Sequence, residues 1–247
     1  MSTKFATPPL PVRSRVKHFA KMVLGKLPWF KEEVSIPKVT YGTDYGGWTI
    51  TPSLVNADSI VYSFGIGHDA SWDIGMIEQH GCKVYAFDPT PDLDQWIAAQ
   101  GYDPRFIFDL RGLAGFDGQV EIRSQSTEEQ TSGTILGSAD LGVDTKGTSI
   151  EVRRIKTLAD ELGHRHIDVL KMDIEGAEFD AIPDILASGI TVDQILIEFH
   201  PYFTNGVSRW KTNLEQLNKA GYRLFDVSRR ALELGFIHER ALARLGK

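Results

Sequence analysis

Short apolar segments alternate with helical segments from residue 60 onward, and this alternation restricts the fold more than any other feature of the chain. Apolar runs predict buried strands at 60–64, 83–87, 105–108, 168–172 and 194–199. Helical patterns lie at 71–79, 93–100, 177–187 and 211–219. Because strands separated by helices build a parallel sheet that is covered on both faces, we predict a doubly wound α/β fold.

Two stretches interrupt the alternation. Residues 120–122 and 149–155 look like strands with no helix between them, and the Ser-, Thr- and Gly-rich chain at 124–148 is predicted to be a loop or flap. Near the end of the chain, predicted strands at 222–227 and 232–237 flank a short polar turn. That spacing indicates an antiparallel hairpin that closes the sheet.

The charge of the chain is divided unevenly. The net charge of −6 over 247 residues separates into +7 for residues 1–31, which contain seven Lys or Arg and no acid, and −13 for the remainder. An acidic body disfavours binding to a phosphate backbone, so we expect no nucleic-acid partner. The single cysteine, Cys82, excludes an intramolecular disulfide framework and a four-cysteine zinc site. It also favours a reducing compartment, and we predict a cytoplasmic location.

The basic head carries apolar side chains at helical spacing between residues 12 and 27, and Pro28 stands where such a helix should end. This amphipathic helix is predicted to dock its apolar face on the main domain. Peripheral contact of residues 12–31 with a membrane surface and a mobile tail are the alternatives. Lys21 and Lys26 interrupt the apolar stretch, which argues against a secretory signal. No run of about 18 apolar residues predicts a transmembrane span.

A glycine-rich turn follows the first predicted strand. Residues 65–70, GIGHDA, have the G-x-G-x-x-A form and open a predicted helix. Glycines allow a ligand to approach closely, and the helix N-terminus offers N–H groups to a carboxylate or phosphate. Asp88, 21 residues after Gly67 and at the end of the second strand, can accept hydrogen bonds from both hydroxyls of a ribose. The pattern predicts an adenosine-containing cofactor, and a tight turn without a ligand is the alternative.

Two cofactors fit this pattern, a nicotinamide dinucleotide and S-adenosylmethionine. Short-chain dehydrogenases of this length need a Tyr-x-x-x-Lys pair, and none of the seven tyrosines has Lys four residues later. A nicotinamide-dependent oxidoreductase is therefore the less favoured alternative. The terminal hairpin also suits a methyltransferase sheet, in which the last strand is inserted antiparallel.

Four polar residues follow two neighbouring strands of the predicted sheet. Asp173 and Glu175 come directly after one strand, and Glu198 and His200 repeat the two-residue spacing at the end of the next. Because ligands bind outside the carboxyl ends of strands in such sheets, we expect these side chains near the reactive end of the cofactor. They could hold a hydroxyl substrate and remove its proton. His200 is the natural general base, since its ordinary pKa lies near neutrality.

The same cluster has other interpretations. Oxygen and imidazole ligands could bind a divalent cation, but we assign none of these residues to a metal. His200 could instead be a structural imidazole, and Asp173 and Glu175 could stabilise the loop. Glu178, on the following helix, is predicted to be a cap or a solvated residue.

Three motifs resemble those of FkbM-type, methyltransferase-like proteins. Residues 61–73, VYSFGIGHDASWD, are similar to the first motif of that family, and residues 84–89, VYAFDP, to the second. Residues 170–178, LKMDIEGAE, resemble its most distinctive signature. The segments YGGW at 45–48 and GLA at 112–114 are also similar. The resemblance spans roughly residues 40–238 in the expected order.

This resemblance implies a Rossmann-like class I methyltransferase sheet of seven strands, with the last hairpin antiparallel, and S-adenosylmethionine as cofactor. Together with the basic head and its predicted helix, it divides the chain into a basic N-terminal extension at 1–40, which contains the amphipathic helix, and a methyltransferase domain at 41–247. The first motif departs from the family's usual asparagine- and glycine-rich turn at His68-Asp69-Ala70. The implied cofactor contacts are Gly65, Gly67, Asp69, Ser71, Asp88, Pro89 and Asp173.

The family also implies methyl transfer to oxygen, often on a sugar, polyketide or other hydroxylated metabolite. We therefore predict direct methyl transfer to the hydroxyl of a small molecule or glycan, with Asp173, Glu175, Glu198 and His200 as catalytic candidates. A non-catalytic, methyltransferase-like binding module is the alternative. Several aromatic residues are expected mainly in the core, with a sugar-stacking wall as the alternative: Trp48, Trp96, Tyr202, Phe203 and Trp210.

Overall fold

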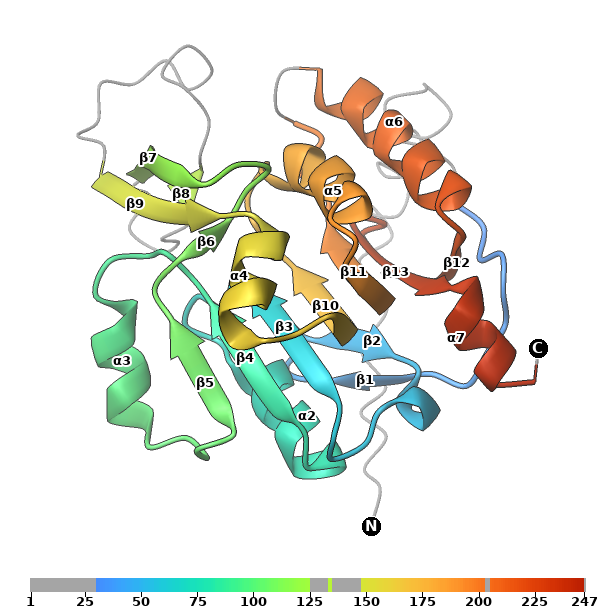
Figure 1. Ribbon diagram of the computed structural model, residues 1–247, viewed down its shortest axis with the longest axis horizontal. Coiled ribbons are helices and arrows are strands. Elements are labelled where there is room, and N and C mark those ends of the chain that lie inside the picture. The colour runs from blue at the N-terminus through green and yellow to red at the C-terminus, as the bar shows by residue number, and fades with distance from the viewer. Residues whose placement is uncertain (1–29, 125–132, 135–147, 203–204, 247) are drawn as a thin grey trace.

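The computed structural model describes residues 30–124, 133–134, 148–202 and 205–246. Its centre is a seven-stranded sheet with the order β12-β13-β11-β10-β3-β4-β5 (Figure 1). The strands are β3 (Ile60–Phe64), β4 (Lys83–Phe87), β5 (Phe106–Asp109), β10 (His166–Met172), β11 (Thr191–Glu198), β12 (Tyr222–Val227) and β13 (Glu233–His238). β13 is antiparallel to both of its neighbours, and the remaining pairs are parallel. The predicted mixed sheet with its antiparallel final hairpin is therefore confirmed.

Helices cover both faces of this sheet. One face carries α2 (Ser71–His80), α3 (Leu93–Gln100), α7 (Glu239–Arg244) and the hairpin of β1 (Val39–Tyr41) and β2 (Trp48–Ile50), followed by a 3₁₀ turn, η1 (Pro52–Leu54). The other face carries α4 (Ile155–Leu162), α5 (Glu178–Ala187) and α6 (Gly206–Lys219). In Figure 1, α4 and α5 lie in front of the sheet and α2 behind it.

Two apolar cores result, because successive side chains of a strand point to opposite faces. On β10, Leu170 and Met172 pack toward α5, whereas Val169 packs toward α2. Helix α2 meets its core with Trp72, Met76 and Ile77, as predicted, and all three are buried. The helix ends at Gly81, whose left-handed backbone lets its N–H reach the carbonyl of Ile77.

A smaller sheet follows β5. Its order is β6-β9-β7-β8, built from β6 (Gly112–Leu113), β7 (Gly118–Ser124), β8 (Gly133–Thr134) and β9 (Thr148–Arg153). The predicted strands at 120–122 and 149–155 are β7 and β9, and they pair directly with each other. Most of the predicted flap at 124–148 lies outside the described residues.

The predicted strand at 149–155 is too long, because helix α4 begins at Ile155. The reason is a contact from far away in the sequence. Asp117 accepts the backbone N–H of Arg154 at 2.8 Å and the hydroxyl of Thr157 at 2.9 Å, which holds the chain where the helix starts. The predictions also missed α7 and the three-residue strands β1 and β2, and they began α6 five residues too late.

The chain joins this domain before residue 40. Glu33 and Val34 both donate backbone hydrogen bonds to the carbonyl of Leu224 on β12, at 2.8 and 3.3 Å. The ring of Phe30 lies 5.2 Å from that of Trp210 on α6. The predicted amphipathic helix lies outside the described residues. Among the residues that are described, no helix has the length and apolar character to cross a membrane.

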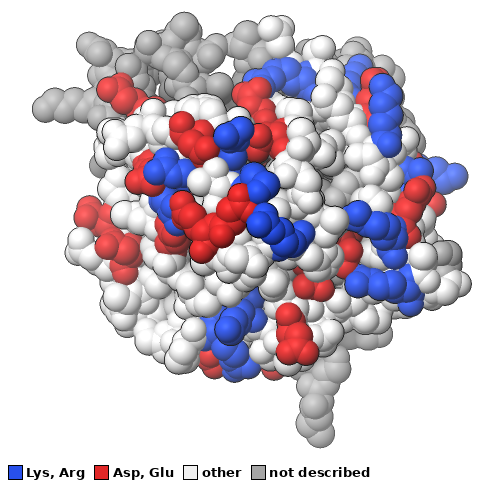
Figure 2. All heavy atoms as spheres, viewed as in Figure 1, with Lys and Arg blue, Asp and Glu red and all other residues white. Residues whose placement is uncertain are grey.

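Acidic and basic side chains lie next to one another on the face shown in Figure 2. Arg111, for example, contacts both Asp109 and Glu161 at 2.7 Å. Asp160 pairs in turn with Lys156 and Arg165. Exposed pairs of this kind add little to stability, because water and salt screen their charges.

Candidate cofactor and catalytic site

The predicted site residues lie at the carboxyl ends of four adjacent strands. Asp88 follows β4, Gly65 follows β3, Asp173 follows β10, and His200 lies just after β11. Because these strands are neighbours in the order β11-β10-β3-β4, the residues form a single row along one edge of the sheet. From β3 the chain crosses to β4 on one side, and from β10 it crosses to β11 on the other side. The two connections thus diverge between β3 and β10, and doubly wound proteins bind ligands in the crevice at such a point.

Gly65 is enclosed by the ends of the neighbouring strands. Its N–H donates to the carbonyl of Phe87 at 3.0 Å, and its φ of +76° lies in the left-handed region. A Cβ atom at this position would lie 1.7 Å from the carbonyl oxygen of Asp173. Only glycine fits there. Gly67 also has a positive φ, but a Cβ there would meet nothing within 4 Å.

Asp88 fastens the glycine turn to β4. One carboxylate oxygen accepts the N–H groups of Ile66 and Gly67 at 2.9 and 2.8 Å, and the other accepts that of Thr90 at 2.9 Å. The side chain is almost buried, with the residue 5% exposed. Since each carboxylate oxygen can accept two hydrogen bonds, the oxygen facing Thr90 retains a lone pair that a ribose hydroxyl could use. The adjacent Pro89 is half-buried.

Asp69 connects the glycine turn to the loop between β1 and β2. Its carboxylate accepts the N–H of Ser71 at 3.0 Å and the hydroxyl of Thr43 at 2.5 Å. The hydroxyl of Ser71 in turn accepts the N–H of Thr43 at 3.0 Å. Burial works against ionisation of Asp69, but the bonds from Ser71 and Thr43 outweigh it and lower the pKa of the carboxyl. This loop carries Tyr45 toward the site.

His200 stands at the centre of the acidic cluster. Its Nε2 lies 3.7 Å from a carboxylate oxygen of Asp173 and 3.4 Å from one of Glu175, and its Nδ1 lies 3.3 Å from one of Glu178. The residue is 2% exposed. The structure thus brings the predicted catalytic residues together, and it adds Glu178 to them.

Glu178 is wholly buried, so the predicted solvated position is wrong, and of the two predicted roles only that of a cap is compatible with the structure. One of its oxygens accepts the N–H of Gly176 and the other that of His200, both at 2.8 Å. The first residue of α5 therefore holds the ends of β10 and β11 together. The available signal was its place as the last residue of the motif LKMDIEGAE, rather than any helical pattern.

The environment of the cluster shifts its titration. Burial alone would lower the pKa of His200, but Glu178, Glu175 and Asp173 raise it to about 9. Burial, followed by the charge of Asp173, raises the pKa of Glu198 to about 7. Burial also raises the pKa of Asp173 and of Glu175. The carboxylates around the ring thus favour the protonated imidazole, whereas the titration of Glu198 lies near neutrality.

Two exposed tyrosines flank this cluster. Tyr202 is 67% exposed, and its ring meets that of His200 edge-on at 5.6 Å. Tyr45 is 78% exposed, and burial at its hydroxyl, followed by the charges of Asp173 and Glu198, raises its pKa.

The other aromatic candidates differ in their positions. Trp48 and Trp210 are buried, as expected of core residues. Trp96 contacts the ring of His68 in the glycine turn at 5.0 Å, and Phe203 lies outside the described residues. Tyr45, which lies near Asp173 and Glu198, was not among the aromatic residues that the sequence suggested for binding an acceptor.

A divalent cation remains chemically compatible with this site. Asp173, Glu175 and His200 offer donor atoms within 4.8 Å of one another. Oxygen and imidazole donors suit several divalent metals. The distances from His200 to Asp173 and Glu175 are equally compatible with a protonated imidazole that pairs with carboxylates and no metal. A second such group, His166, Asp168 and Asp193, is built on β10 and β11 outside the catalytic cluster.

The strand order, the glycine turn and the acidic cluster define a class I methyltransferase-like α/β protein. The chain belongs to the FkbM methyltransferase family, because the family described as "Methyltransferase FkbM domain" matches residues 43–224. That match includes all four strand ends of the site.

Two curated relatives are both named "Probable methyltransferase-like protein 24". The protein from Homo sapiens is 23% identical over 190 residues, which is 72% of this chain and 45% of the relative. The protein from Rattus norvegicus is 23% identical over 177 residues, which is 67% of this chain and 42% of the relative. The chain thus spans less than half the length of either relative.

Two solved structures match the chain at low identity. Fibrillarin, a pre-rRNA processing protein from Methanococcus jannaschii, aligns with a TM-score of 0.41 at 13% identity, over 74% of this chain and 68% of its own. A putative transferase from Pyrococcus horikoshii aligns with a TM-score of 0.34 at 11% identity, over 92% and 82%. The fold assignment rests on the strand order itself.

Proposed function

We propose that this chain is an S-adenosylmethionine-dependent O-methyltransferase that acts on the hydroxyl of a sugar or another small metabolite. One observation carries the proposal: the strand ends that hold the glycine turn and Asp88 are adjacent to those that hold Asp173 and His200. A cofactor seat and a cluster able to accept a proton therefore share one crevice. Membership of a methyltransferase family implies the cofactor.

The residues present fit S-adenosylmethionine. The turn approaches β10 so closely that no side chain could replace Gly65, and the position of Gly67 is open on its outer side. The backbone of this turn would hold the cofactor, the remaining lone pair of Asp88 would accept a ribose hydroxyl, and Asp173 would lie near the methyl donor. When bound, the cofactor supplies an electrophilic methyl group.

The chain's own residues would orient the acceptor and take its proton. Glu198 is the base in this proposal, because a carboxylate with a pKa of about 7 is matched to neutral pH. His200, protonated and fixed by Glu178, would donate a hydrogen bond from Nε2 and hold Asp173 and Glu175 in place. Alignment of the acceptor oxygen supplies much of the rate enhancement in a displacement of this kind.

The mouth of the site supports a neutral, polyhydroxyl acceptor. Its carboxylates can accept hydrogen bonds from several hydroxyl groups, and the faces of Tyr45 and Tyr202 can pack against an apolar sugar face. The guanidinium of Arg230 lies 3.2 Å from a carboxylate oxygen of Glu198 and is the cation that pairs with this acid. An acceptor with its own carboxylate next to the hydroxyl would be repelled by these acids.

A transfer experiment tests the proposal. The purified chain is incubated with methyl-labelled S-adenosylmethionine and a library of glycans and hydroxylated metabolites, with and without a chelator. We expect label on an acceptor oxygen, and its loss in Glu198→Gln with cofactor affinity unchanged. Glu215→Gln, an exposed carboxylate on α6, is the matched control. Cofactor binding without transfer would instead support a methyltransferase-like binding module.

A further inference from the structure

Lys171 on β10 is a buried lysine directly beneath the glycine turn. The residue is 4% exposed, and its ammonium group donates to the carbonyl oxygen of Gly65 at 2.6 Å and to that of Phe64 at 3.4 Å. The ring of Trp48 lies 5.5 Å from the same ammonium group. Lysine is almost never fully buried unless it is paired, so the burial of Lys171 needs a structural or functional explanation.

Three carboxylates on different elements share this one cation. Burial raises the pKa of Asp73, a buried residue of α2, and the charge of Lys171 is the largest effect that opposes it. The same holds for Asp173 at the end of β10. At Asp69, burial and the bonds from Ser71 and Thr43 act first, and Lys171 lowers the pKa further. Lys171 therefore balances the negative charge that surrounds the turn.

The contact with Gly65 also explains how the turn keeps its shape. The positive φ of Gly65 directs its carbonyl inward, where Lys171 is the donor that meets it. On the opposite side, the same glycine is pressed against the carbonyl of Asp173. Removing the ammonium would leave the half-buried carbonyl of Gly65 without its donor, and the turn would have to move to recover a partner.

We propose that Lys171 is a positioning residue for the cofactor site, which holds the Gly65 carbonyl and so fixes the glycine turn against the end of β10. The inference rests on the proposed function, since the turn is the cofactor seat. Lys171 acts through the turn, because its ammonium faces backbone carbonyls below the site and is shielded from solvent.

The test compares Lys171→Met, which keeps the apolar stem, with Lys171→Arg and with Lys211→Met, an exposed lysine on α6. We expect Lys171→Met to weaken S-adenosylmethionine binding in calorimetry by about tenfold, because the turn loses the donor that holds the half-buried Gly65 carbonyl. Lys171→Arg should recover part of the loss, and Lys211→Met should bind as the wild type does.

Hydrogen exchange supplies a readout that is independent of the cofactor. Without cofactor, the amides of Ile66 and Gly67 should exchange faster in Lys171→Met, while those of α6 stay unchanged. If Lys171→Met does not fold, the double variant Lys171→Met/Asp73→Asn removes the buried ammonium together with the buried carboxyl of α2, and it should show the same faster exchange. Wild-type exchange and affinity in the folded variant would overturn the proposal. A wild-type chain that does not bind the cofactor would overturn the proposed function alone.

Discussion

The buried carboxylate of Glu178 accepts the backbone N–H of His200 at 2.8 Å and lies 3.3 Å from Nδ1 of the same imidazole. One side chain at the start of α5 thereby fixes both the end of β11 and the orientation of the ring. The Nε2 atom is turned toward Asp173 and Glu175. Carboxylates on both sides favour the protonated imidazole, which is why the proposed mechanism assigns the proton-accepting role to Glu198.

Glu178→Gln should lower the pKa of His200. Glutamine keeps the shape and one of the two acceptor oxygens, which can still accept the N–H of His200, and it removes the negative charge closest to the ring. Its amide nitrogen would replace the oxygen that accepts the N–H of Gly176, so folding of the variant is checked by circular dichroism first. The pKa should fall from about 9 toward the ordinary value of 6.5. Titration of the imidazole resonances by NMR measures the shift, and Glu215→Gln serves as the control. An unchanged His200 pKa in Glu178→Gln would contradict this account of the cluster.

The rate of methyl transfer should depend on pH in a bell-shaped manner. The ascending limb, near pH 7, reports loss of the Glu198 proton, and the descending limb, near pH 9, reports loss of the His200 proton. The profile of kcat/KM measures both limbs, and Glu198→Gln should remove the ascending one. A single ascending limb near pH 9 would instead make His200 the base.

Gly65→Ala should abolish cofactor binding, whereas Gly67→Ala should weaken it only mildly. Both positions have a positive φ, which costs an alanine about 1 kcal/mol. Only at Gly65 would the new Cβ collide with backbone, at 1.7 Å from the carbonyl oxygen of Asp173. Calorimetry with S-adenosylmethionine compares the two variants. Equal affinities would show that the turn does not rest against β10 in solution.

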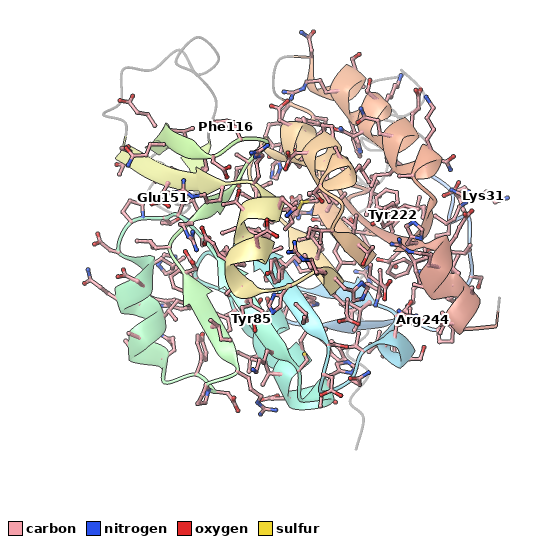
Figure 3. All side chains as sticks on the ribbon, in the orientation of Figure 1. Lys31, Tyr85, Phe116, Glu151, Tyr222 and Arg244 are labelled. Carbon is pink, nitrogen blue, oxygen red and sulfur yellow. The ribbon has the colours of Figure 1, made fainter. Side chains whose placement is uncertain are left out.

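The stabilisation that protonated His166 gives to the fold should be lost at alkaline pH. Its Nε2 faces Asp168 and Asp193, and Asp193 also pairs with Arg244 on α7, which Figure 3 labels. The hydrogen bonds to Asp168 and Asp193 raise the pKa of His166 to about 9. Because the folded pKa lies above the ordinary value of 6.5, the stabilisation is complete below pH 6.5 and is lost as pH rises through 9.

Urea unfolding of the wild type and His166→Gln at pH 6.5 and pH 9.5 measures this effect. Since the side chain is 39% exposed, we expect a difference of only about 1 kcal/mol at pH 6.5. The difference should disappear at pH 9.5. A difference that stays constant between the two pH values would assign His166 a packing role instead.

The sequence predicted the sheet because its strands carry a local signal. Strands such as β4 and β11 are buried on both faces, so they consist of continuous apolar runs. Such runs can be recognised in the sequence without knowing which strands they pair with. The start of α4 is set by Asp117, which lies 37 residues before Arg154. The strands β1 and β2, of three residues each, are too short to show a period. Such features depend on contacts between distant residues.

The sequence predicted which residues come together at the site, but it did not predict their pKa shifts. Strand-end logic placed Asp173, Glu175, Glu198 and His200 together, and the structure agrees. The choice of His200 as base used its ordinary pKa, which the buried Glu178 changes. No helical pattern distinguishes a buried glutamate at the start of a helix from a solvated one, and only the place of Glu178 in the motif LKMDIEGAE pointed to it. Lys171 escaped notice for the same reason, since lysine in a strand is normally exposed.

Cofactor binding by the wild-type chain tests the central claim most directly. Calorimetry should show saturable binding of S-adenosylmethionine and none of NAD. Asp88→Ala should bind about tenfold more weakly, because it loses both the ribose acceptor and the tie that holds the turn. Binding of NAD without binding of S-adenosylmethionine would contradict the account.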